Sequence, residues 1–210
     1  EVFKNCSWQV TEDFENKSVF IAAGSKEAQD TLAVSELAGR IRELAGLYFN
    51  LKAGIVYGPL IHSGSTLMSE ITQMKRAFEL MFYSGFRNSC LSSREMMNDD
   101  ENAVRQVILE QINAIYSELI MGNCQGTEES FATIVRAGEQ SRLNPYRLKK
   151  QLKKLLREVE KRLMGNGFCQ EEVFDEYFND EDAIFAAEDE SSLLAAIRTI
   201  IRGAAQKITN

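Results

Sequence analysis

The strongest chemical signal in the sequence is a concentration of positive charge between residues 142 and 162. Nine basic residues and two acidic ones give this stretch a net charge of +7. At about 100° per residue, its leucines group on one side of a helix and most of its basic residues on the other. The pattern therefore predicts a basic amphipathic helix. Its candidate partner-binding residues are Arg147, Lys150, Lys153, Lys154, Arg157 and Lys161.

A concentration of negative charge follows directly. The stretch 171–190 holds ten acidic residues and no basic one, and the aromatic side chains between them favour an amphipathic segment over a free tail. The sequence around Asp180 lacks the alternating ligands and the central glycine of an EF-hand, so it predicts no calcium loop. An electrostatic docking surface and a merely solvated acidic face both fit this tract. Its candidate contact residues are Glu171, Glu172, Asp175 and Glu176.

Several interpretations of the basic face are open. It could bind an acidic protein, the phosphates of a nucleic acid or an anionic membrane surface, or it could be solvated without a partner. The two oppositely charged tracts could also pair within one chain or between copies, and a protein that carries both can assemble head to tail. An exposed ion pair contributes only about 0–1 kcal/mol. The segregation of charge therefore bears on orientation and specificity more than on stability.

Signals for catalysis are weak. The one histidine, His62, lies beside Ser63, and neighbours in sequence rarely converge as base and nucleophile. The motifs of nucleotide-binding loops, zinc proteases and α/β-hydrolases do not occur. The four cysteines have no metal-ligand spacing; they are Cys6, Cys90, Cys124 and Cys169. We therefore expect no enzyme activity, no cofactor and no metal site.

The composition is that of an ordinary globular protein. The 210 residues are 44% hydrophobic and 26% charged, which is enough apolar material for a core. The net charge of −7 disfavours a protein covered with nucleic-acid-binding surface. No run of about 18 apolar residues occurs, so no membrane-spanning helix is expected. The cellular compartment, the redox state of the cysteines and the oligomeric state stay open.

Helices must position these charged tracts, because a period of 3.6 residues dominates the chain. We expect an all-α fold, an irregular bundle of five main helices with shorter ones. A poorly defined N-terminal arm occupies 1–24, in which 17–22 fits a short strand and Thr11 fits a helix cap equally well. The helical domain follows at 25–210, with a sub-boundary conceivable near 123–144. The helices are expected near 25–52, 65–83, 99–121, 127–136, 144–164, 170–178, 180–187 and 191–205.

Three local signals make sharper predictions. Asn144 and Pro145 are the preferred N-cap and first helical residue, so a helix should begin there. Thr127 is expected to cap the preceding helix, and Gly138 to end it. The apolar segment 54–64 is a connection interrupted by glycine and proline, and we expect it to be buried or paired.

These observations favour a non-enzymatic helical protein that works through protein–protein contact. An adaptor, an assembly subunit or a structural component would fit, and so would a viral or a secreted protein. The expected partner is an acidic protein surface or another copy of the chain, which would give a homo-oligomer. The alternative is a nucleic-acid-binding protein that uses the basic helix 147–162. Binding to phosphates should weaken steeply with salt, which separates the two.

Overall fold

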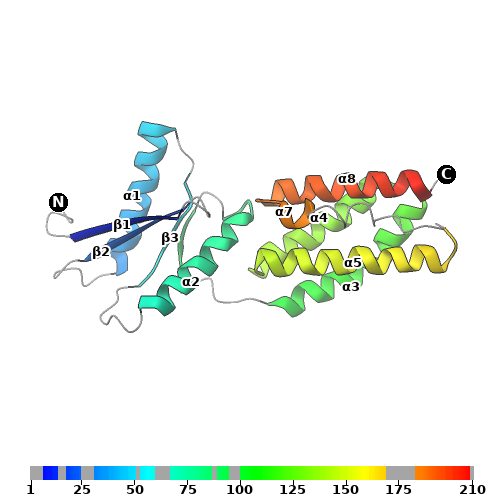
Figure 1. The fold of residues 1–210 in the computed structure, drawn as a ribbon, viewed down its shortest axis with the longest axis horizontal. Helices are drawn as coiled ribbons and strands as arrows, with labels where there is room; N and C mark the ends of the chain where they lie inside the picture. Colours follow the sequence, from blue (N-terminus) through cyan, green and yellow to red (C-terminus); the bar gives the residue numbers. More distant parts are fainter. Residues whose placement is uncertain are drawn as a thin grey trace.

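Helices dominate the structure, a computed structural model that describes residues 7–13, 18–24, 31–50, 53–59, 67–86, 89–94, 100–168 and 183–208. The prediction of an all-α fold is confirmed, because the described strands form only two small sheets of two strands each. The molecule is elongated, with the strands and two helices at one end and a helical bundle at the other (Figure 1).

The N-terminal part combines both sheets with two helices. Its elements are β1 (Ser7–Asp13), β2 (Ser18–Gly24), α1 (Thr31–Phe49), β3 (Ile55–Tyr57), α2 (Leu67–Glu79), the 3₁₀ turn η2 (Leu80–Phe82) and β4 (Cys90–Ser92). The first two strands pair antiparallel, which confirms the strand expected at 17–22 and shows that Thr11 lies in a strand and caps no helix. β3 pairs with β4 in parallel, so the apolar segment is paired where it is described. His62 lies outside the described residues.

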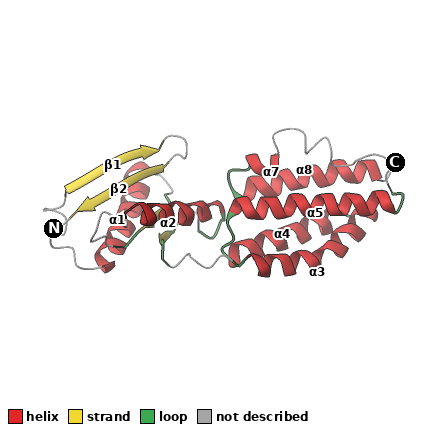
Figure 2. Cartoon of the chain, turned by 60° about the horizontal axis from the view of Figure 1, so that its bottom comes forward, coloured by secondary structure: helices red, strands yellow, loops and turns green. Residues whose placement is uncertain are grey.

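The C-terminal part is a bundle of four long helices. Its elements are α3 (Glu101–Ile120), α4 (Cys124–Gln140), α5 (Pro145–Gly165), the short α7 (Ala183–Ala186) and α8 (Glu190–Ile208). α3, α4 and α5 alternate in direction, whereas α8 runs parallel to α5 and packs mainly on α4 (Figures 1 and 2).

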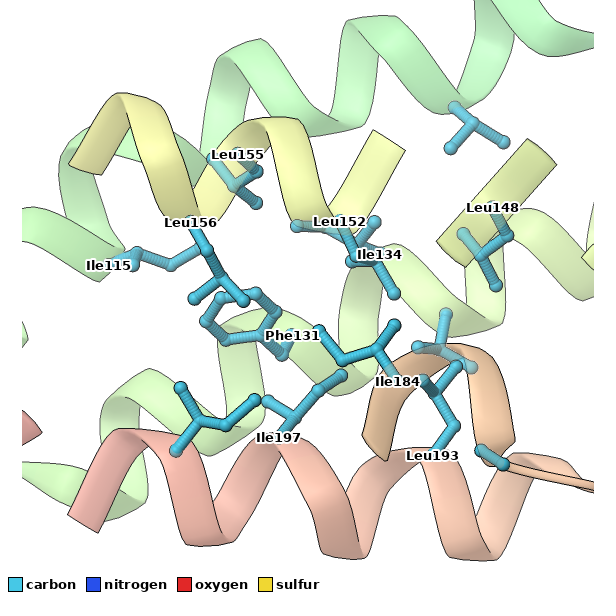
Figure 3. Packing of buried hydrophobic residues seen from close by; sticks show 14 of the residues in the cluster. Ile115, Phe131, Ile134, Leu148, Leu152, Leu155, Leu156, Ile184, Leu193 and Ile197 are labelled. Atoms are coloured by element: carbon cyan, nitrogen blue, oxygen red, sulfur yellow. The ribbon is translucent and has the colours of Figure 1, made fainter. Parts of the chain in front are cut away.

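The core of the bundle contains the leucine face predicted for α5. Leu148, Leu152 and Leu156 are fully buried against Phe131 and Ile134 of α4, and residues from α7 and α8 close the other side (Figure 3). Burying such a side chain stabilises the fold by about 1.5–3 kcal/mol. The α5 leucines therefore orient the helix, and its opposite face is turned towards solvent.

The boundaries of α4 differ from those predicted. Asn123 is its N-cap, and its side chain accepts a hydrogen bond from the Gly126 amide at 3.2 Å. Thr127 is buried inside the helix and donates its hydroxyl to the Asn123 carbonyl, so it is no cap. Gly138 is buried inside the helix as well and does not end it. A methyl group at Gly138 would lie 3.0 Å from the Tyr83 hydroxyl oxygen, so this glycine permits close packing.

The predicted start of α5 is confirmed, whereas the cap of α8, expected at Ser191, is two positions earlier, at Asp189. The Asn144 side chain accepts hydrogen bonds from the amides of Tyr146 and Arg147, and Pro145 follows it. At the other end the helix stops at Gly165. α8 begins at Glu190, where the Asp189 side chain accepts a hydrogen bond from the Ser192 amide at 2.8 Å.

The two parts meet at the turn that follows α2. Tyr83 is fully buried in the bundle core, and its hydroxyl donates a 2.7 Å hydrogen bond to the Leu143 carbonyl. Next to it, two carboxylates from the bundle accept hydrogen bonds from successive backbone amides. The pairs are Ser84 N to Glu190 Oε2 at 2.8 Å and Gly85 N to Glu139 Oε1 at 2.7 Å. Asn144 also donates its side-chain amide to Glu79. This turn is therefore built into the bundle and is more than a linker.

Candidate interaction surface

The outer face of α5 carries a line of exposed positive charge. Lys150, Lys154, Arg157 and Lys161 are all exposed. Their spacings of four, three and four residues place them within about 60° of one another around the helix, along about 16 Å of its length. We call these four residues the basic ridge. The exposed Glu158 beside it is engaged by Arg162, whose Nε lies 3.3 Å from Oε1.

Polar contacts join the flank of α5 that faces α3 to that helix. Arg147 lies 3.8 Å from Glu101, which also accepts a 2.7 Å hydrogen bond from Gln151. Arg162 donates to Asn113 of α3 at 3.1 Å. The structure thus places Arg147, one of the predicted partner-binding residues, at an intramolecular contact beside the ridge.

The opposite flank contains a buried lysine. Lys149 is only 8% exposed, and its ammonium group donates hydrogen bonds to the carbonyl oxygens of Phe185 at 3.2 Å and Ala187 at 2.6 Å. It also lies 5.0 Å from the ring of Phe82. Burial lowers the pKa of Lys149 from its ordinary value, because desolvation disfavours the charged form. Lys149, one of the nine basic residues in 142–162, is therefore a buried residue and adds no charge to the surface.

A pair of aromatic rings lies next to this lysine. Tyr146 is 63% exposed, and its ring centroid lies 5.5 Å from that of Phe185 of α7. Lys153, half-buried, places its ammonium group 5.7 Å from the same Phe185 ring. We call Tyr146 and Phe185 the aromatic shelf. The sequence does not reveal this shelf, because the spacing within α5 shows which residues share a side but not which distant residue packs there.

The acidic candidates cannot be placed in the same way. Glu171, Glu172, Asp175 and Glu176 lie outside the described residues. At the end of the acidic tract, Asp189 caps α8 and Glu190 accepts the Ser84 amide. These last two acids contribute to the fold itself, as the basic flanks of α5 do.

A second surface feature is a groove of about 620 Å³ between α4 and α8. Its lining includes Cys124, Leu194 and Ile197, and an ion-pair group crosses it. Glu128 lies 2.8 Å from Arg198 and 3.5 Å from Arg202. Three of the charges that line the groove, those of Glu128, Arg198 and Arg202, are thus paired with one another.

The residues that the structure describes contain neither a metal-binding cluster nor a membrane-spanning helix. No group of three or more histidine, cysteine or acidic residues there is arranged to hold a metal ion. None of the described helices combines the length and the apolar character needed to cross a bilayer. Comparisons with protein-family models, with curated proteins and with solved structures found no match to this chain.

Proposed function

We propose that this protein is a non-enzymatic helical interaction module that binds an acidic protein surface through the basic ridge of α5. The observation that carries the proposal is the separation of roles around this helix. Its leucines lie in the core, its flanking polar residues contact α3 and α7, and the ridge points outwards.

The ridge lysines support this function because they contribute little to holding the fold together. No acid among the described residues forms an ion pair with Lys150, Lys154 or Lys161. A row of like charges on one helix is mildly destabilising by itself. Such a row steers an oppositely charged partner towards one face and rejects partners of the same sign.

Another copy of this chain is the partner to test first. The protein is acidic overall, with a net charge of −7, and its ten-residue acidic set lies in 171–190. Contact between the ridge of one copy and an acidic region of the next is heterologous, so it would build rings or open chains. Self-association of this kind should weaken as salt rises, since exposed charges are screened over about 8–10 Å.

The test is a charge reversal of the three ridge lysines in Lys150→Glu, Lys154→Glu and Lys161→Glu. We expect the combined variant to keep its helicity by circular dichroism, because the three positions are exposed and glutamate is a good helix former. It should lose self-association, measured as mass by light scattering, and lose binding to a polyglutamate probe. Lys153 is left unchanged because it contacts Phe185.

A matched control reverses Arg40, Arg94 and Arg136, which are exposed elsewhere and change the net charge equally. This control should behave as the wild type does. If both variants lose binding equally, net charge and not the ridge is responsible. If the ridge variant associates and binds normally, the ridge is only a solvated face. Binding to duplex DNA that falls steeply with salt and is lost in the ridge variant would instead support the nucleic-acid function.

A further inference from the structure

The aromatic shelf lies at one end of the basic ridge. Tyr146 is four residues before Lys150, so the two share one side of α5, and Phe185 of α7 packs against the tyrosine ring. An exposed tyrosine ring, packed on a half-buried phenylalanine beside a row of cations, is therefore a second feature of the same surface.

Contacts with the bundle hold the shelf in place. Lys149 donates hydrogen bonds to the carbonyl group of Phe185 in α7 and to that of Ala187 directly after it, and Lys153 covers the Phe185 ring. Ile184, the neighbour of Phe185, is fully buried in the core. Because these contacts order the rings before any partner arrives, binding at the shelf would lose little conformational entropy.

Charge and aromatic surface contribute differently to recognition. Exposed charges mainly raise the rate of association and set specificity. Tight binding usually depends on a few buried anchors, among which tyrosine and arginine are over-represented. A ridge of lysines alone would give weak, salt-sensitive contact, whereas the shelf adds an apolar surface that a partner can cover.

We infer that the partner of the ridge is an acidic segment that carries an apolar side chain, which packs on Tyr146 and Phe185 while its carboxylates face the lysines. The inference rests on the proposed function and specifies the chemistry of the partner. Charge complementarity identifies the occupant. When an apolar side chain packs on the shelf, the neighbouring groups of the partner lie beside Lys150 and Lys153, and acidic groups fit there.

Two labelled synthetic helical peptides test the inference by fluorescence anisotropy. Both carry glutamates at spacings of four, three and four residues to match the ridge; one has a leucine at each end, and the other has alanine there. Wild-type protein should bind the leucine peptide at least tenfold more tightly, since covering one leucine is sufficient for that factor. Tyr146→Ala should remove this preference while leaving the salt dependence unchanged.

Three controls keep the outcomes distinct. Tyr146→Phe retains the ring and should retain the preference, whereas Tyr48→Ala removes an exposed tyrosine in α1 and should change nothing. The ridge variant should lose both peptides. Equal affinity of the wild type for the two peptides would overturn the inferred apolar contact at the shelf but not the binding by the ridge. If the wild type binds neither peptide, both the inference and the proposed function are wrong. If oligothymidylate binds and Tyr146→Ala weakens it tenfold, the shelf stacks bases and the inference is wrong.

Discussion

Two neighbouring lysines of α5 illustrate how much the surroundings of a residue decide its role. Lys149 and Lys150 are adjacent and chemically identical, yet the first is buried beneath α7 and the second is exposed on the ridge. The difference follows from a rotation of about 100° between successive residues, which directs one side chain into the bundle and the other out of it. Charge counted along the sequence is therefore a poor measure of charge presented at a surface.

Replacing Lys149 by methionine should destabilise the protein by about 1–3 kcal/mol. The variant keeps a long apolar stem but leaves the carbonyl groups of Phe185 and Ala187 without their donor, and unpaired buried polar groups carry such a cost. Lys150→Met is the matched control, because a change at its exposed site should stay within about 0.5 kcal/mol. Urea denaturation of both variants measures the difference, and equal stability would show that Lys149 contributes no net hydrogen bonding.

At the scale of the element, α4 shows that glycine inside a helix can serve packing. A methyl group added at Gly138 would lie 3.2 Å from both terminal carbons of Leu148 and close to the Tyr83 hydroxyl. Both neighbours are fully buried, and Tyr83 is further fixed by its bond to Leu143. The helix therefore continues through the glycine, because tertiary contact compensates for its low propensity.

We expect Gly138→Ala to destabilise the protein by about 1 kcal/mol. Alanine gains roughly 1 kcal/mol in helix propensity, but crowding in a packed core costs about 1–3 kcal/mol. Gly39→Ala in α1 is the matched control. Apart from the local helix backbone, none of the described residues places an atom within 4 Å of the new methyl group, and the change should stabilise by about 0.5–1 kcal/mol. Thermal unfolding of the two variants should shift in opposite directions; a rise in both would show that the core around Gly138 adapts freely.

At the scale of the whole molecule, the turn after α2 joins the N-terminal part to the bundle. Tyr83 inserts into the core, and polar contacts surround it, including the bond from Asn144 to Glu79. Asn144 thus caps α5 and binds α2 at the same time. Because the apolar and polar contacts converge on one turn, we expect the two parts to unfold together.

This junction should make stability depend on pH through Glu79. Partial desolvation at the junction raises the pKa of Glu79 above its ordinary value, although the bond from Asn144 and the charge of Arg76 oppose the shift. The folded state therefore holds this proton more tightly than the unfolded state does. The stabilising contribution is full below the ordinary pKa and is lost as pH rises through the folded value.

Glu79→Gln retains an acceptor for Asn144 and cannot ionise. Relative to wild type, the variant should gain stability as pH rises from about 4 to about 7, measured by urea denaturation at several pH values. A difference that is constant over this range would contradict the assigned role. A difference that grows towards low pH would mean that the carboxylate of Glu79 is favoured in the folded state.

The sequence by itself determined the features that depend on local chemistry. The 3.6-residue period predicted the helices, the pair Asn144 and Pro145 predicted where α5 begins, and the leucine spacing predicted which of its faces is buried. These inferences succeed because capping and amphipathicity act within a few residues. The exposed ridge followed from the same period, since it lies opposite the leucines.

The tertiary structure alone decided which charged side chains serve the fold. Sequence could not show that Lys149 meets the carbonyl of Phe185, 36 residues away, or that Gly138 faces Tyr83. It also could not reveal the aromatic shelf, because Tyr146 and Phe185 come from helices whose packing depends on the whole core. Periodicity specifies a face of a helix, but the identity of what covers that face depends on contacts between residues that are distant in the chain.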